Sequence, residues 1–142
     1  PETGATVSAV QRPVVIITSN AEKELPDAFL RRCVFHYIAF PDQAQMERIV
    51  RVHHPGLDER LIQAAMEGFY LLREMDGLQK RPSTSELVDW VQALAVAGVD
   101  PAKIVDELPF MGVVLKKQAD LDIARRHMSI RARRAAMQEG RG

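Results

Sequence analysis

The chain has 142 residues, of which 46% are hydrophobic and 27% are charged, proportions that are ordinary for a soluble globular protein. Lys and Arg together number 19, as do Asp and Glu, so the overall charge gives no reason to expect nucleic acid or acidic lipid as a partner. Cys33 is the only cysteine, which excludes an intrachain disulfide and fits a cytoplasmic protein, and no apolar run reaches the ~20 residues of a membrane span.

The first third of the chain is typical of an α/β protein. Residues 14–18 form a β-branched run, and residues 34–38 are rich in aromatic and β-branched side chains, so both segments predict strands. A short helix is expected between them, over residues 26–32. The fold class that follows is an α/β remnant, with two parallel strands of a larger core sheet, followed by an all-α helical domain.

After Pro41 the apolar residues recur at the spacing of helices. Asp42 can cap a helix that runs to about His53, and a second helix is expected from Leu57 to about Arg73. The apolar stripes expected on these two helices consist of Met46, Ile49, Val50 and His53, and of Leu61, Ile62, Ala65, Met66, Phe69 and Leu72.

The pattern Ser83-x-x-Glu86 predicts a capping box at the start of a third helix. A shorter helix is expected from Pro101, and then one or two more that break near Gly112 or Gln118. For the last dozen residues we expect a frayed helix or disorder. The apolar stripe expected on the third helix consists of Leu87, Trp90, Val91 and Leu94.

Two adjacent stretches carry a compound motif. Residues 12–20 are an apolar run that ends in Thr-Ser-Asn, and residues 24–33 follow the pattern Leu-Pro-x-Ala-Phe-Leu-x-Arg. In this order they resemble the second half of an AAA+ ATPase core, most closely that of the MoxR branch. The resemblance extends to about residue 125. It implies a remodelling or chaperone protein that hydrolyses ATP with Mg²⁺ and transmits the motion of its lid to a client.

The resemblance also implies roles for three polar residues. Asn20, at the end of a strand, would be the sensor-1 residue that positions the γ-phosphate and the attacking water. Arg32 would be the arginine finger that reaches the ATP of a neighbouring subunit, with Arg31 as the alternative. On the other interpretation, Asn20 only supports a turn and the two arginines lie at an exposed helix end.

A third phosphate contact is expected on the helical lid. Members of the family carry a sensor-2 arginine at the start of a lid helix, but the corresponding position falls near Ser85, which cannot replace it. Arg81 or Lys80, one turn earlier, can reach the phosphates instead, and the alternative is a plain cation at the helix entry. His53 and His54 diverge on their helix, so we expect no metal site there.

The chain lacks both a Gly-x-x-x-x-Gly-Lys-(Ser/Thr) loop and an apolar run followed by Asp-Glu. The resemblance therefore implies a C-terminal half that is inactive alone and is not expected to bind nucleotide. Residues 1–41 would belong to the α/β core, residues 42–126 to the helical lid, and residues 127–142 to a basic tail. The intact protein would act as a homo-oligomer, expected to be a hexameric ring, with a von Willebrand factor A-domain protein as a possible partner.

A second hypothesis is a non-catalytic helical adaptor that binds a protein or nucleic acid through its basic C-terminal helix. Residues 116–142 hold eight basic and three acidic residues, a net charge of +5. They lack interleaved aromatic side chains, which makes nucleic acid the less expected partner. The adaptor predicts a self-sufficient helical fold, whereas the ATPase predicts an exposed apolar surface on residues 14–18 and 34–38.

Overall fold

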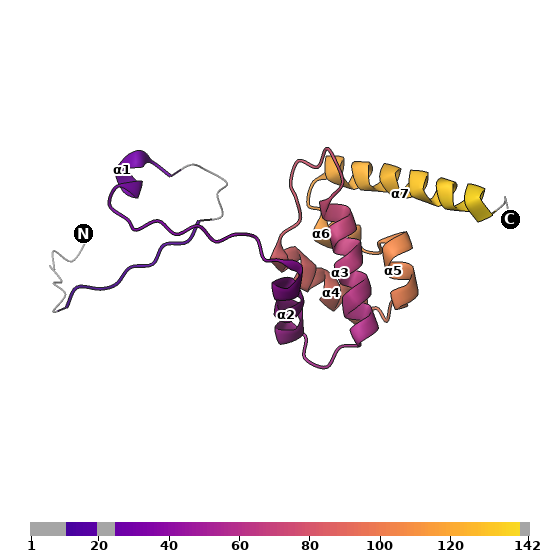
Figure 1. Cartoon of the computed structure of the whole chain (residues 1–142), viewed down its shortest axis with the longest axis horizontal. Helices are drawn as coiled ribbons and strands as arrows, with labels where there is room; N and C mark the ends of the chain where they lie inside the picture. The colour runs from indigo at the N-terminus through magenta and orange to yellow at the C-terminus, as the bar shows by residue number, and fades with distance from the viewer. Residues whose placement is uncertain (1–10, 20–24, 140–142) are drawn as a thin grey trace, which may run out of the picture. The chain divides into compact units, whose positions relative to one another are not determined.

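The computed structural model describes residues 11–19 and 25–139, and all regular secondary structure in this part of the chain is helical (Figure 1). The chain divides into two units, Pro1–Ala39 and Phe40–Gly142. The described part of the first unit contains helix α1, Asp27–Leu30. The helices of the second unit are α2 (Gln43–His53), α3 (Glu59–Arg73), α4 (Thr84–Val96), α5 (Pro101–Glu107), α6 (Met111–Val114) and α7 (Gln118–Glu139).

No strand forms in residues 11–19 or 25–139, so the expectation of two parallel strands in an α/β remnant is wrong. The backbone of residues 14–18 and 34–38 is irregular, and their apolar side chains are exposed, by 91% at Val14 and 100% at Val34. A strand is stable only when a neighbouring strand pairs with its N–H and C=O groups. β-branched composition supplies a local preference, which does not produce a strand without that pairing.

The helix starts predicted at Asp42 and Ser83 in the second unit are confirmed. Oδ1 of Asp42 accepts a hydrogen bond of 2.8 Å from the N–H of Gln45, whose side chain accepts one of 3.3 Å from the N–H of Asp42. At the start of α4, the carboxylate of Glu86 accepts a hydrogen bond of 2.7 Å from the N–H of Ser83. These capping boxes satisfy N–H groups that have no partner within the helix.

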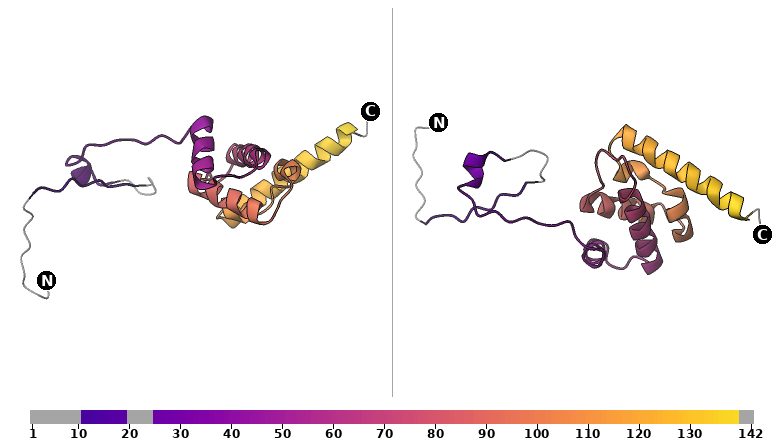
Figure 2. Two further views of the ribbon diagram at one scale, coloured as in Figure 1. Left: turned by 90° about the horizontal axis from the view of Figure 1, so that it is seen from below. Right: turned by 45° about the horizontal axis from the view of Figure 1, so that its top comes forward.

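The buried hydrophobic residues of the described chain all belong to the second unit. Helix α3 lies between α2 and α5 (Figure 2) and contacts α4 as well. Trp90 and Phe69 are the largest fully buried side chains, and Nε1 of Trp90 donates a hydrogen bond of 2.6 Å to the carbonyl of Pro109. Of the predicted stripe on α2, Ile49 is half-buried and His53 is exposed. The predicted positions that are buried are Met46 and Val50 on α2, Leu61, Ile62, Ala65, Met66, Phe69 and Leu72 on α3, and Leu87, Trp90, Val91 and Leu94 on α4.

The C-terminal part of the chain is more helical than its sequence predicts. Gly112 lies within α6, and the break falls just before Gln118, where α7 begins. Helix α7 continues without interruption to Glu139, so the boundary expected between residues 126 and 127 falls inside it. Among the described helices, none combines the length and hydrophobicity that a bilayer crossing requires.

Candidate functional site

Two residues expected to contact phosphate, Lys80 and Arg81, lie on the α3–α4 loop (residues 74–83), which is attached to α7. The loop is attached through Asp120 of α7, a residue that is only 1% exposed. Its Oδ1 accepts a hydrogen bond of 2.8 Å from the N–H of Gln79, and its Oδ2 accepts one of 3.2 Å from the N–H of Lys80. A buried carboxylate is stable only with such partners, so Asp120 fixes the path of the loop.

The other end of the loop is attached to α4. Glu86 is 7% exposed. Its carboxylate accepts hydrogen bonds from both the N–H and the hydroxyl of Ser83, the latter at 3.0 Å. The ammonium of Lys80 lies 3.5 Å from Oε1 of Glu86, although the Lys80 side chain is still 47% exposed. Lys80 therefore compensates the charge of a buried acid, which leaves Arg81 as the freer cation of the predicted pair.

Arg73, in the last turn of α3, completes the attachment of the loop. Its guanidinium donates a hydrogen bond to the carbonyl of Pro82, and its Cζ lies 3.5 Å from the centroid of the Phe40 ring. Burial lowers the pKa of Arg73, and the positive charge of Arg81 lowers this pKa further. The positive charges of Arg73 and Arg81 thus disfavour each other, and a bound anion would offset this repulsion.

Arg73, Lys80, Arg81 and Lys117 form what we call the cationic loop surface. Lys117 joins the group because its Nζ donates a hydrogen bond of 3.2 Å to the side-chain oxygen of Gln79. Lys80 and Arg81 are exposed on a loop that is held at both ends, so they can bind an anion such as phosphate with little loss of conformational freedom. All four residues are cations, which suits this surface to the binding of an anion.

Arg31 and Arg32 belong to the first unit, in which they follow α1. Both side chains are exposed, and Nη1 of Arg32 donates a hydrogen bond of 2.7 Å to the carbonyl of Ala28 one turn earlier. The arginine expected to act as the finger is thus at a helix end and accessible to solvent. Asn20, the expected sensor-1 residue, lies outside the described residues.

The sequence did not single out Arg73, Lys117 or Asp120 as parts of a site. Arg73 was visible only as a cation in a last helical turn, which is a common position. Asp120 and Lys117 reach the loop across 41 and 38 positions of sequence, and no local pattern encodes such contacts.

A second surface feature is an open hollow of about 660 Å³, lined by residues of α2, α3, α5 and α7 and by the C-cap residue of α3. Its polar lining includes Glu67, Glu74 and Arg131, and the hydroxyl of Tyr70 at this place is buried with no hydrogen-bond partner. No group of three His, Cys, Asp or Glu residues in the described chain is arranged to hold a metal ion. The hollow is lined by Gln43, Gln63, Glu67, Tyr70, Leu71, Glu74, Val105 and Arg131.

Comparisons with known proteins give no match: no family model, no curated protein and no solved structure is detectably similar to this chain.

Proposed function

We propose that this chain is the nucleotide-sensing and helical-lid part of a cytoplasmic ATPase of the MoxR-type AAA+ class, which hydrolyses ATP with Mg²⁺ as a homo-oligomeric ring. The observation that carries the proposal is the cationic loop surface. Asp120 and Glu86 hold the loop from two helices, and Arg81 is exposed on that loop. Guanidinium groups are suited to phosphate because they stay charged and donate several hydrogen bonds in a fixed geometry.

In this proposal the two units divide the work of phosphoryl transfer. Asn20 orients the attacking water, and Arg32, or Arg31 in its place, stabilises the charge that develops on a neighbouring subunit's nucleotide. Arg81 and Lys80 contact the phosphates from the lid. The chain has no phosphate-binding Gly-rich loop, so by itself it is expected neither to bind nor to hydrolyse ATP. A von Willebrand factor A-domain protein is a possible partner of the ring.

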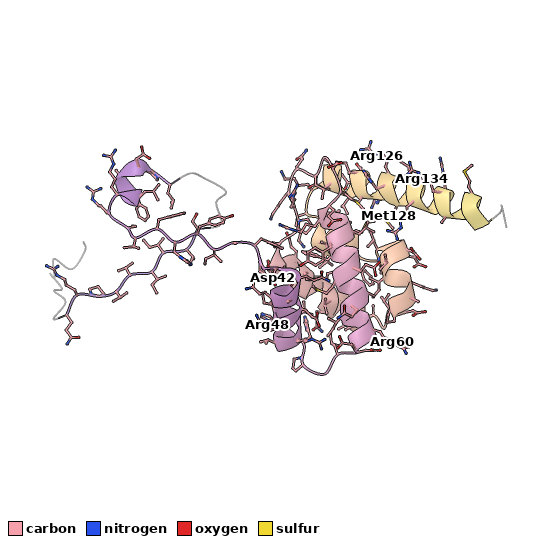
Figure 3. All side chains as sticks on the ribbon, viewed as in Figure 1. Asp42, Arg48, Arg60, Arg126, Met128 and Arg134 are labelled. Atoms are coloured by element: carbon pink, nitrogen blue, oxygen red, sulfur yellow. The ribbon has the colours of Figure 1, made fainter. Side chains whose placement is uncertain are left out.

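The contribution of the loop is tested by Arg81→Gln in the ATPase that contains this chain. Loss of one charged hydrogen-bond donor to phosphate should weaken ATP binding by about tenfold. The matched control is Arg60→Gln, an exposed arginine in the first turn of α3, at the other end of that helix from Arg73 (Figure 3). If the two variants bind ATP with the same affinity by calorimetry, the loop surface is not the phosphate contact.

One observation favours the adaptor as a second candidate: the second unit contains all the buried hydrophobic residues of the described chain, while α7 presents arginines to solvent. In that case α7 would bind a protein or nucleic acid without any nucleotide chemistry. The test is the binding of a labelled oligonucleotide and of a labelled acidic peptide of equal charge, each measured by fluorescence anisotropy. Binding of either that Arg133→Gln weakens would support the adaptor, and no binding of both would refute it.

A further inference from the structure

Helix α7 has an inner and an outer face. Its first half packs against the other helices of the second unit through Leu121, Ala124 and Met128, which are half-buried or buried. From Ser129 to Met137 every described side chain is exposed. Figure 3 shows Met128 on the side of α7 that faces the other helices.

The outer face carries a regular stripe, formed by Arg126, Ile130, Arg133 and Met137. Their spacing of four, seven and eleven residues places them within about 60° of one another around the helix, opposite the inner face. The side chains of Ile130 and Met137 are 51% and 73% exposed. Among the described residues, Arg126 and Arg133 make no ion pair, whereas Arg125 and Arg131 pair with Asp122 and Asp106.

A surface of opposite charge lies on α3, along the hollow. Glu67 and Glu74 are exposed and make no ion pair within the described part of the chain. Between them, Tyr70 and Leu71 are half-buried and line the same hollow, together with Val105 of α5. We call Glu67, Tyr70, Leu71 and Glu74 the α3 acidic face. Arg131 of α7 also lines this hollow, and its guanidinium is paired with Asp106 at 3.8 Å.

The two surfaces match in spacing and in chemistry. Arg126 and Arg133 are seven residues apart, as are Glu67 of α3 and Glu74, the C-cap residue directly after α3, and along a helix this separation corresponds to about 10.5 Å. Ile130 lies between the two arginines, as Tyr70 and Leu71 lie between the two acids, so ion pairs at both ends would enclose an apolar contact.

The charge distribution of the chain favours a second copy as the occupant. Residues 40–115 hold seven basic and twelve acidic residues, a net charge of −5, against +5 for residues 116–142. The outer stripe of a rigid helix faces away from its own second unit, so it cannot reach the α3 acidic face of the same chain. With a net charge of zero, two copies do not repel each other overall.

We propose that the outer stripe of α7 in one copy binds the α3 acidic face of a second copy, head to tail. The inference does not rest on ATP hydrolysis. Because each copy keeps one free stripe and one free acidic face, association can continue to a closed ring or an open chain. The contact is small and exposed, so we expect weak association that depends on salt.

Charge exchange tests the proposal by sedimentation equilibrium of the 142-residue chain. The wild type should exceed its monomer mass of 15.9 kDa at ~50 mM salt and approach it at ~500 mM salt. The variant Arg126→Glu with Arg133→Glu should be monomeric, as should Glu67→Arg with Glu74→Arg. An equimolar mixture of these two variants should associate again, because the exchanged charges are then complementary.

The control variant is Arg48→Glu with Arg60→Glu. It changes the net charge by the same amount as Arg126→Glu with Arg133→Glu, at exposed positions outside both surfaces, and should associate like the wild type. Circular dichroism verifies that all variants remain helical. A wild type that is monomeric at low salt, or exchanged variants that associate as the wild type does, would overturn the proposal. A mixture that stays monomeric would do the same.

Discussion

Asp120, in the first turn of α7, accepts a hydrogen bond of 3.2 Å from the main-chain N–H of Lys80, 40 positions earlier in the chain. The contact makes the position of the α3–α4 loop depend on the docking of α7. Lys80, Arg81 and the C-terminal helix are therefore parts of one structural unit, and a change at the start of α7 should alter the loop.

The first prediction concerns this carboxylate. Asp120→Ala removes the acceptor of the N–H groups of Gln79 and Lys80 and should destabilise the fold by about 1–3 kcal/mol. Asp122→Ala is the control, because Asp122 is exposed and its ion pair with Arg125, at 3.6 Å, contributes at most about 1 kcal/mol. Urea unfolding measures both, and equal effects would show that Asp120 does not hold the loop.

The second prediction concerns Gly68, in the buried face of α3. A Cβ atom there would lie 3.0 Å from Leu108 Cδ2 and 3.0 Å from Trp90 Cη2. Gly68→Ala should therefore destabilise by about 1–3 kcal/mol through overpacking, although alanine is the better helix former. Gly112→Ala, in open space on α6, should not destabilise. Thermal unfolding measures the effect, and a melting temperature of Gly68→Ala equal to or above that of the wild type would contradict this packing.

The third prediction concerns the buried hydroxyl of Tyr70. Because this hydroxyl has no hydrogen-bond partner, Tyr70→Phe should be neutral or stabilise the fold by up to about 1 kcal/mol. Burial raises the pKa of Tyr70 above its ordinary value of 10.0. The unfolded chain therefore ionises at lower pH than the folded chain, and the wild type should lose stability as the pH rises above 10.0 towards the raised pKa of the folded state. The phenylalanine variant should lack this part of the loss. Marked destabilisation by Tyr70→Phe at neutral pH would reveal an unseen partner.

The fourth prediction concerns Arg51, whose guanidinium bonds Glu47 and Glu59 and so links α2 to the start of α3. Its hydrogen bond holds the pKa of Glu59 below the ordinary 4.5. The resulting stabilisation is present above pH 4.5 and is lost as the pH falls through the lowered pKa. Arg51→Gln should thus melt slightly below the wild type at pH 7 and equally with it in strong acid, while Arg48→Gln shows no pH-dependent difference.

The sequence predicted the local features of the helical unit well. Asp42 and Ser83 begin helices as expected, because a cap is encoded within four residues. The buried stripes of α3 and α4 follow from a period of 3.6 residues. The strands were wrong for a different reason: residues 14–18 and 34–38 prefer extended backbone, but strand formation depends on pairing partners, which local sequence does not specify.

The candidate site could be predicted only in part. The sequence points to Arg81 and Lys80 through their place before a helix that resembles a lid helix, and their role as phosphate contacts stays a prediction. Arg73 and Asp120 were not identified, because their roles come from contacts with Pro82 and with the loop amides that exist only in the folded unit. Local patterns thus locate the loop, and tertiary contacts define its surface.

The most direct test of the proposed function is ATP turnover by Arg32→Ala in the ATPase that contains this chain, with Arg31→Ala and Arg60→Ala beside it. Loss of a finger that acts on a neighbouring subunit should lower hydrolysis by ~10³-fold or more and leave ATP binding unchanged. If Arg31→Ala alone has this effect, the finger is Arg31. Turnover that stays at the wild-type rate in both the Arg31→Ala and the Arg32→Ala variants would contradict the assignment of this chain to a ring-forming ATPase.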